Sequence, residues 1–200
     1  MSIKVCNRCV MDTTIKVIDF DEKGICNYCK TYEYRVLTEL YKEPERSQKL
    51  NRLIEKIKND GKNKNYDCVI GVSGGVDSSF VAHLVKEFGL RPLAIHLDNG
   101  WNSELAVKNI QQLLNILDID LYTHVIDWEE FKDLQKAFIR SSVENLEIPT
   151  DHAINALLLK MADKYGIKYI LNGSNLVTEG ILPIQGGRNI DYRFLKDIHD

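Results

Sequence analysis

A run of serine and glycine residues stands between an apolar segment and a stretch of good helix formers. The apolar segment, residues 68–72, is short and uninterrupted, as expected of a strand buried on both faces of a parallel sheet. Two consecutive glycines after it let backbone N–H groups approach a ligand that any Cβ would exclude, and the N-terminus of the helix that follows favours an anion. We therefore predict a loop that cradles phosphate groups, with the sequence Ser73-Gly74-Gly75-Val76-Asp77-Ser78-Ser79.

The charged residue inside this loop indicates which kind of phosphate site it forms. The loop lacks the lysine of a G-x-x-x-x-G-K-[ST] motif and contains Asp77 instead. A carboxylate repels phosphates unless a divalent cation lies between them, so Asp77 predicts a bridging Mg²⁺, while hydroxyl groups on Ser73, Ser78 and Ser79 supply uncharged donors. The pattern resembles the S-G-G-x-D-S loop of the PP-loop ATP pyrophosphatases. This resemblance implies cleavage of ATP between its α- and β-phosphates, with transfer of AMP to an oxygen of a second substrate. A plain Gly-Ser turn is the alternative.

Four cysteines near the N-terminus form two C-x-x-C pairs, Cys6 with Cys9 and Cys26 with Cys29. This spacing predicts a tetrathiolate zinc ribbon, with an iron–sulfur site or disulfides as alternatives. Between the pairs we expect a strand over residues 10–18 and a turn over 21–24. Four thiolates leave no open position for water or substrate, so the metal is predicted to be structural and to stabilise a segment too short to fold unaided.

The rest of the composition describes an ordinary globular protein. Of its 200 residues, 44% are hydrophobic and 28% charged, and the formal net charge of −3 disfavours a nucleic-acid partner. The absence of a signal-like N-terminus and of a long apolar run predicts a cytoplasmic protein without a membrane segment. The fifth cysteine, Cys68, stands in the strand before the loop, where a core role is favoured over that of a nucleophile.

The order of the predicted elements indicates an α/β fold. After a zinc ribbon at 1–31 and a helical connector and linker at 32–65, residues 66–200 form the predicted PP-loop ATP-binding domain, which is expected to continue beyond the chain end. Strands at 68–72, 92–97, 121–126 and 168–171 alternate with helices at 78–87, 104–117, 128–144 and 151–165. Such alternation predicts a doubly wound parallel sheet with right-handed crossovers, and the PP-loop resemblance implies the adenine nucleotide alpha hydrolase type of this fold.

Ligands of such sheets bind beyond the carboxyl ends of the strands. If the strand order is 3-2-1-4, the segments that follow the second and fourth strands flank the phosphate loop. We therefore expect Leu97 and Asp98 to meet the nucleoside, Gly173 and Ser174 to lie beside the phosphates, and Glu179 to be a second Mg²⁺ ligand. Solvated loop carboxylates are the alternative for Asp98 and Glu179.

Further along the chain, three residues are candidates for contact with the second substrate. His152 is a candidate proton acceptor, although a helix cap formed by Thr150 or Asp151 is the favoured explanation of that segment. Arg188 and Arg193 are candidates for contact with an anionic substrate.

The paired cysteines, residues 11–14, residues 20–29 and the phosphate loop together resemble the N-acetyl sugar amidotransferase family. This resemblance implies that an acetamido group on a free or nucleotide-linked sugar becomes an acetamidino group in surface-polysaccharide or nonulosonic-acid synthesis. It further implies ATP, Mg²⁺ and ammonia from a separate glutaminase subunit. Two alternatives are a PP-loop tRNA-thiolation enzyme, which needs further cysteines in its catalytic domain, and a non-catalytic zinc-ribbon or nucleotide-binding protein.

Overall fold

The computed structural model describes residues 3–143, 145–181 and 191–199. The chain divides into two compact units, the first made of Met1–Leu50 and Ser174–Asn189 and the second of Asn51–Gly173 and Ile190–Asp200. The segment expected to connect the two domains, 32–65, is thus shared between the units. No helix in the described ranges combines the length and the apolar character that a membrane crossing requires.

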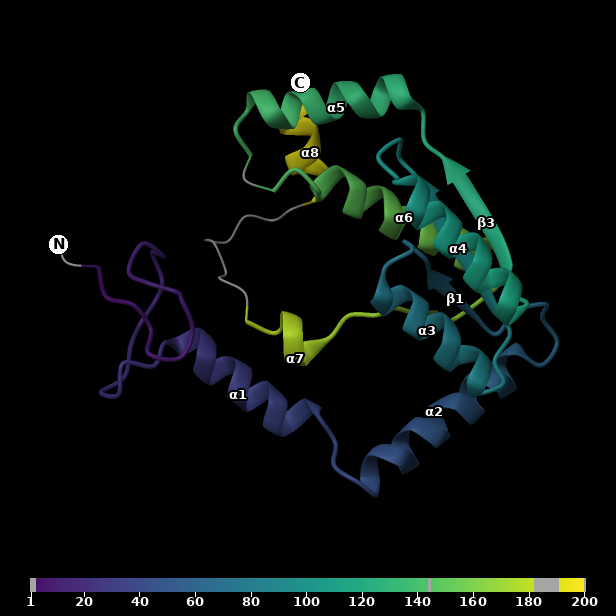
Figure 1. Cartoon of the computed structure of the whole chain (residues 1–200), viewed down its shortest axis with the longest axis horizontal. Helices are drawn as coiled ribbons and strands as arrows, with labels where there is room; N and C mark the ends of the chain where they lie inside the picture. The colour runs from purple at the N-terminus through teal and green to yellow at the C-terminus, as the bar shows by residue number, and fades with distance from the viewer. Residues whose placement is uncertain (1–2, 144, 182–190, 200) are drawn as a thin grey trace. The chain divides into compact units, whose positions relative to one another are not determined.

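The second unit is built on a four-stranded parallel sheet (Figure 1), as predicted. Its strands are β1 (Cys68–Gly71), β2 (Pro92–Asp98), β3 (Asp120–Val125) and β4 (Ile170–Leu171), in the order β3-β2-β1-β4. This is the order assumed above for placing the segments that flank the phosphate loop. In the register of the sheet, Cys68 lies opposite Pro92, and Val69 lies opposite Ile170. The carboxyl ends of β1, β2 and β4 therefore lie at one edge of the sheet, where the phosphate loop begins.

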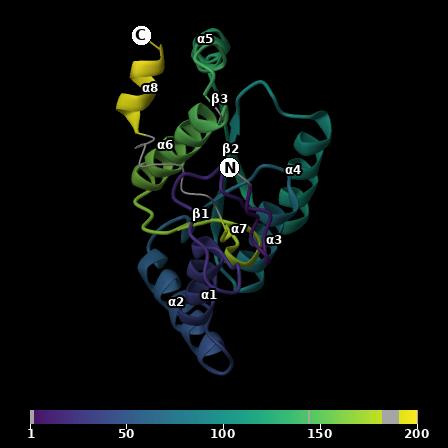
Figure 2. The same ribbon diagram turned by 90° about the vertical axis from the view of Figure 1, so that its left-hand side faces the viewer.

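Helices cover both faces of the sheet, as Figure 2 shows. On one face lie α3 (Val76–Glu87) and α4 (Glu104–Leu117), and on the other lies α6 (Ile148–Lys164). Alternate residues of β1 point to the two layers, since Ile70 belongs to the apolar cluster with α3 and α4, whereas Val69 belongs to the cluster with α6. A strand that is buried on both sides explains its uninterrupted apolar sequence.

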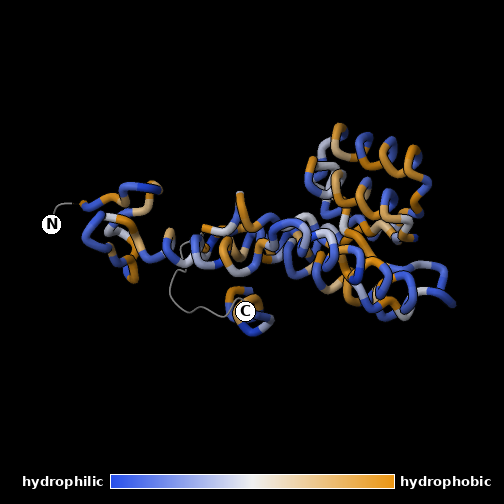
Figure 3. Tube along the Cα trace, turned by 90° about the horizontal axis from the view of Figure 1, so that it is seen from below, coloured by the Kyte–Doolittle hydropathy of each residue, from blue (hydrophilic) through white to orange (hydrophobic). Residues whose placement is uncertain are grey.

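The remaining helices of the second unit pack at its periphery. Helix α2 (Glu45–Gly61) buries Ile54 and Ile57 in the cluster with α3 and α4, as its spacing predicts, while Leu53 stays 45% exposed. Helix α8 (Tyr192–His199) lies beside α5 (Trp128–Arg140), where the rings of Phe138 and Phe194 meet edge to face with centroids 6.1 Å apart (Figures 1 and 2). Colouring by hydropathy shows apolar and polar residues side by side within the helical turns (Figure 3), the pattern of helices with one buried face.

The first unit contains the paired cysteines, α1 (Asn27–Glu39) and the short α7 (Leu176–Glu179). The predicted strand over residues 10–18 is wrong. Asp12 closes a turn there by accepting hydrogen bonds from the backbone N and hydroxyl of Thr14, and only isolated bridges, Val5 with Asp12 and Phe20 with Cys26, are present. The predicted turn over 21–24 is present, with Gly24 at φ +72° and its N–H donating to Asp21 O at 2.9 Å.

Candidate functional site

The phosphate loop joins β1 to α3 through a network of its own serines. The backbone N of Ser73 donates to Ser78 Oγ at 3.2 Å, and the hydroxyl groups of Ser78 and Ser79 donate to Gly75 O at 3.1 and 2.8 Å. Gly75 is the N-cap of α3 and offers no side chain to the helix, so the N–H groups of its first turn face outward without a side-chain cap. Such a helix start is suited to bind an anion.

Two glycines allow the backbone to close around this loop. Gly74 has φ +79°, and a Cβ built on it would lie 2.5 Å from Ala106 O in the first turn of α4. Gly173, after β4, approaches α3 so closely that its Cβ would lie 3.1 Å from the Asp77 backbone carbonyl carbon. Any larger residue at either position would force the neighbouring backbone apart, so the predicted placement of Gly173 beside the loop is what the geometry shows.

Asp77 stands in the first turn of α3 and is exposed. Within the described parts of the chain, no hydrogen bond or ion pair engages its carboxylate. A carboxylate held beside an anion-binding helix start, with no cationic side chain attached to it, fits the donor set that Mg²⁺ prefers when it bridges protein and phosphate oxygens. The residues present therefore fit a magnesium–phosphate site, and the role of Asp77 as the protein ligand of the metal stays a prediction.

The segment after β2 turns back across the same edge of the sheet. Asp98 Oδ1 accepts hydrogen bonds from the backbone N of Gly100 at 3.1 Å and from Asn102 Nδ2 at 3.0 Å. One carboxylate oxygen of Asp98 therefore shapes this turn, while Leu97 is partly buried against the apolar cluster under α6. Both residues lie at the carboxyl end of β2, as expected, and their contact with a nucleoside stays a prediction.

Helix α6 brings its first turn to this edge as well. It begins at Ile148 with Glu147 as N-cap, so the predicted capping role of Thr150 or Asp151 is wrong, because both lie inside the helix. Thr150 instead accepts a hydrogen bond from Asn99 Nδ2 at 3.4 Å, which joins α6 to the turn after β2. His152 follows in the same turn and is half-buried, and its role as proton acceptor stays a prediction.

Sequence reasoning missed two residues that support the phosphate loop. His96 on β2 is buried, and its Nδ1 lies 3.0 Å from Val72 O, so Nδ1 carries the proton and donates to the carbonyl just before the loop. Asn109 on α4 reaches the loop from outside and donates through Nδ2 to Gly74 O at 3.4 Å. A polar residue within the apolar run 92–97 was the one available hint for His96.

Ser174 and Glu179 belong to the first unit, whereas Asp77 belongs to the second. Glu179 ends α7 and accepts a hydrogen bond from the backbone N of Asn175 through Oε2 at 3.1 Å. Its role as second magnesium ligand stays a prediction. Arg193 is exposed on α8, and Arg188 lies outside the described residues.

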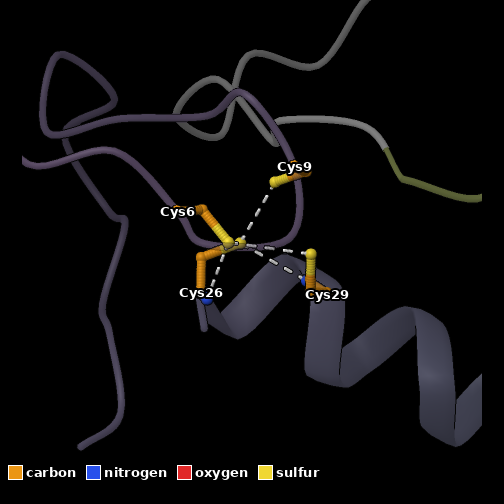
Figure 4. Close-up of side chains that lie close together, drawn as sticks. All are labelled: Cys6, Cys9, Cys26 and Cys29. Atoms are coloured by element: carbon orange, nitrogen blue, oxygen red, sulfur yellow. Dashed lines mark hydrogen bonds between the residues drawn. The ribbon is translucent and has the colours of Figure 1, made fainter. Parts of the chain in front are cut away.

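The four paired cysteines converge on one point (Figure 4). Their Sγ atoms all lie within 4.8 Å of one another, with Cys6 and Cys29 3.9 Å apart and Cys9 and Cys26 3.7 Å apart. A tetrahedral ion with metal–sulfur bonds of about 2.3 Å requires sulfur atoms about 3.8 Å apart. The cluster therefore fits a tetrathiolate metal site, and no cysteine pair is joined by a disulfide.

Backbone N–H groups around the cluster are arranged to stabilise thiolates. The N–H groups of Arg8 and Cys26 donate to Cys6 Sγ at 3.4 and 3.3 Å. Burial acts to raise the pKa of Cys6, but backbone hydrogen bonds outweigh it and lower the pKa to about 6. Burial, followed by the neighbouring thiols, raises the pKa of Cys29. Opposite shifts within one cluster are expected of neighbouring thiols whose charges repel unless a cation lies among them.

Cys68, in contrast, is a core residue. Its side chain is 0% exposed on β1, and desolvation by burial, assisted by the charge of Asp67, raises its thiol pKa to about 12. A thiol with such a pKa is protonated at neutral pH and is a poor nucleophile. The structure thus agrees with the core role predicted for Cys68.

Comparison with curated proteins finds relatives that match part of this chain. The tRNA(Ile)-lysidine synthase of Chlamydia pneumoniae is 32% identical over 90 residues, which cover 40% of this chain and 28% of the relative. The tRNA-specific 2-thiouridylase MnmA of Nitratiruptor is 27% identical over 56% of this chain and 35% of the relative. The tRNA-specific 2-thiouridylase MnmA 2 of Fusobacterium nucleatum is 30% identical over 52% of this chain and 32% of the relative. The chain spans about a third of the length of these relatives.

Among solved structures, the chain is similar to NH3-dependent NAD synthetase from Campylobacter jejuni, with 21% identity, a TM-score of 0.46 and coverage of 64% of this chain and 56% of that one. NMN synthetase from Francisella tularensis is 26% identical, with a TM-score of 0.48 and coverage of 68% of this chain and 56% of that one. Glutamine-dependent NAD+ synthetase from Acinetobacter baumannii, with 13% identity, a TM-score of 0.51 and coverage of 73% and 31%, shares the fold.

The parallel sheet and the phosphate loop place the chain in the PP-loop ATP pyrophosphatase superfamily. Within it, the family model for NAD synthase matches residues 47–156, which are 110 of the 200 residues. These residues include β1, the phosphate loop, β2 and the start of α6. The chain therefore belongs to the NAD synthase family.

Proposed function

We propose that this chain is an ATP-dependent amidotransferase that adenylates the acetamido oxygen of an N-acetylated sugar and replaces that oxygen with ammonia. The observation that carries the ATP chemistry is the open start of α3, where Asp77 stands among uncapped N–H groups and hydroxyl donors. The sugar is supported by the sequence resemblance described above, which includes the paired cysteines of the first unit.

The chemistry follows from the electrophile. An amide carbon reacts poorly with ammonia, because its nitrogen donates electrons into the carbonyl. When the amide oxygen attacks the α-phosphorus of ATP, the bond to the β-phosphate breaks and pyrophosphate leaves toward the phosphate loop. Ammonia then adds to the carbon, AMP departs with the former amide oxygen, and one proton is released.

The residues of the chain have positioning and electrostatic roles in these reaction steps. The N–H groups at the start of α3 would receive the leaving pyrophosphate, and the Ser78 and Ser79 hydroxyls would turn from Gly75 O to donate to it. Mg²⁺ held by Asp77 would neutralise the phosphate charge when bound. His152, in the first turn of α6, is proposed to accept the proton released by ammonia. Holding the amide oxygen and the α-phosphorus in line supplies the rest of the rate enhancement.

Ammonia is proposed to come from a separate glutaminase subunit. A glutaminase needs an activated cysteine nucleophile. Of the five cysteines of the sequence, four form the metal cluster, and Cys68 is buried with a raised pKa. If the pure chain hydrolysed glutamine at the rate of ATP cleavage, and Cys68→Ser abolished this hydrolysis, the proposal of a separate supplier would be wrong.

The names of the curated relatives support a second candidate, a tRNA-modifying enzyme. Thiolation of tRNA is disfavoured, because Cys68, the one cysteine outside the cluster of four, is fully buried. The formal net charge of −3 also disfavours binding of a polyanion.

One experiment separates the candidates. The chain is incubated with ATP, Mg²⁺ and ammonium, and AMP and pyrophosphate are measured with N-acetylated sugars, with bulk tRNA and with the carboxylate precursor of NAD. We expect an N-acetylated sugar to stimulate release of AMP and pyrophosphate in equal amounts. Stimulation by tRNA or by the NAD precursor alone would replace the sugar assignment, and release of ADP and orthophosphate would overturn the ATP chemistry.

A further inference from the structure

An exposed tryptophan lies at the edge of the sheet where the phosphate loop begins. Trp101 follows β2 by three residues and is 67% exposed, while Trp128, at the start of α5, is 39% exposed. A large apolar ring that remains open to water in a folded protein is a marker of a binding surface. None of the roles assigned above uses either indole.

The exposed ring is held in place, although it contributes little to the core. Trp101 Nε1 donates to Gln135 Oε1 at 2.8 Å, and its backbone N donates to Asn99 Oδ1 at 3.2 Å. The two indoles meet edge to face, with ring centroids 5.7 Å apart and planes at 71°. A ring fixed before a ligand arrives loses little conformational entropy on binding, which favours affinity.

The backbone between the two rings is also adapted to their contact. Gly100 has φ +81°, and a Cβ built on it would lie 2.9 Å from Trp128 Cε3. Only a glycine allows the Trp128 ring to lie directly against this turn without displacement. The aromatic pair is therefore a built feature of the segment that leaves β2.

This pair is continuous with the candidate ATP site. The segment that carries Trp101 leads directly into α4, whose first turn contacts the phosphate loop through Ala106 and Gly74. Asp98, three residues before Trp101, ends the strand at which we expect the nucleoside. Trp101 thus stands between the strand end expected to meet the nucleoside and the helix that contacts the phosphate loop.

The charges around the pair favour a ligand without phosphate groups. Trp128 follows Asp127, the N-cap of α5, and precedes Glu129 and Glu130, while Glu104 stands three residues after Trp101. Lys132 is nearby, but it is paired with Glu129 at 2.7 Å. Carboxylates in this number repel the backbone of RNA and the diphosphate of a nucleotide sugar.

We propose that Trp101, supported by Trp128, is a stacking surface for the pyranose ring of the acceptor, and that the acceptor is a neutral N-acetylated sugar rather than a nucleotide-linked one. An indole face binds the apolar C–H face of a pyranose and excludes water from it. The inference rests on the proposed function, because it names the acceptor of that site and the residue that selects it.

The experiment uses the fact that the chain contains two tryptophans. Its intrinsic fluorescence therefore reports on this pair directly, without any need for turnover. The full chain is titrated with the methyl glycoside of N-acetylglucosamine, and separately with UDP-N-acetylglucosamine, adenosine and a short single-stranded RNA. We expect a saturable fluorescence change with the methyl glycoside, retained in Trp128→Phe, where Trp101 is the reporter, and a weaker response to the nucleotide sugar.

A matched pair of variants tests the contact by saturation-transfer NMR, which needs no fluorophore. Trp101→Ala should weaken binding of the methyl glycoside by about tenfold. Ile116→Ala, which removes an 82% exposed apolar side chain from the far end of α4, should leave binding unchanged. Sugar binding that is unaffected in a folded Trp101→Ala protein would overturn the proposal. So would a saturable fluorescence response to adenosine or RNA but not to the sugar, or no saturable response at all.

The outcome is distinguishable from failure of the proposed function. If the methyl glycoside binds at Trp101 but no sugar stimulates pyrophosphate release, the surface exists and the reaction assignment is wrong. If a sugar stimulates pyrophosphate release and Trp101→Ala leaves its KM unchanged, the reaction stands and the role of Trp101 is wrong.

Discussion

Gly74 in the phosphate loop lies directly against Ala106 of α4, and a Cβ on Gly74 would lie 2.5 Å from the Ala106 carbonyl oxygen. The loop is therefore shaped by a backbone that is distant in sequence, and the hydrogen bond from Asn109 Nδ2 to Gly74 O at 3.4 Å strengthens this contact. The close approach makes Gly74 the most sensitive glycine of the loop.

Gly74→Ala is expected to destabilise the protein and to abolish nucleotide binding. The backbone at φ +79° costs about 1–2 kcal/mol for a residue with a Cβ, and the clash with Ala106 adds to this. Urea unfolding and binding of an ATP analogue are the measurements.

Gly166→Ala, at φ +63° with nothing within 4 Å of its Cβ, measures the conformational strain alone. Gly75→Ala, whose Cβ would meet only Ser73 Oγ at 3.5 Å, should be milder than both. Equal effects at Gly74 and Gly166 would contradict the close packing.

The cysteine cluster is expected to hold one zinc ion per chain. Cys29→Ser should lose the metal and unfold the segment around the cluster, because a metal completes the small first unit. Cys68→Ala, a change of a buried cysteine outside the cluster, should retain it. Elemental analysis of protein purified without added metal checks both variants. Iron in place of zinc, or four free thiols in the native protein, would refute the assignment.

Asp77→Asn is expected to separate nucleotide binding from turnover. Without Mg²⁺, the variant should bind ATP at least as well as the native protein, because a carboxylate that repels phosphate has been removed. With Mg²⁺, release of pyrophosphate should fall about 100-fold, because the bridge to the metal is lost. Asp163→Asn, an exposed change on α6, is the control. Full magnesium-dependent turnover in Asp77→Asn would show that another residue holds the metal.

The hydrogen bond of Tyr66 is expected to make the stability of the protein depend on pH in the alkaline range. Its hydroxyl donates to Asp120 Oδ2 at 2.8 Å, and this bond, together with burial, raises the pKa of Tyr66 from 10.0 to about 12. Because the folded pKa is raised, the stabilising contribution is fully present below pH 10 and is lost as the pH rises toward 12. The difference in unfolding free energy between native protein and Tyr66→Phe should therefore shrink across this range. Tyr34→Phe, an exposed tyrosine, should show no such trend, and a constant difference for Tyr66→Phe would contradict the raised pKa.

The phosphate loop and its surroundings were largely predictable from the sequence, because their signals are local. A buried strand, two glycines, Asp77 and a helix follow one another within twenty residues or so, and each constrains the next through backbone geometry. The parallel sheet followed from the alternation of elements, whereas the strand order β3-β2-β1-β4 entered only as an assumption that the structure agrees with. The convergence of four cysteines followed from their spacing.

The predictions of secondary structure were wrong where a tertiary or side-chain interaction outweighed the local sequence preference. Residues 10–18 have strand-forming side chains, but the Asp12 carboxylate captures the backbone of Thr14 and turns the chain. Helix α6 begins at Ile148, before the expected cap at Thr150, with Pro149 in the first turn, where proline is well tolerated, and Thr150 instead contacts Asn99 from the turn after β2. A preference of a few tenths of a kcal/mol for one conformation is readily outweighed by such contacts.

By itself, the sequence determined which chemistry is possible, since residue types and short spacings decide where phosphate and metal can bind. Tertiary structure decided which distant groups meet one another. His96 meets the carbonyl before the loop across two strands, Arg91 pairs with the buried Asp67 at 2.6 Å, and Trp101 lies against Trp128 through a gap that only Gly100 leaves open. The physical reason is that packing and hydrogen bonds between elements depend on the register of the strands and the placement of the helices, which no local sequence window contains.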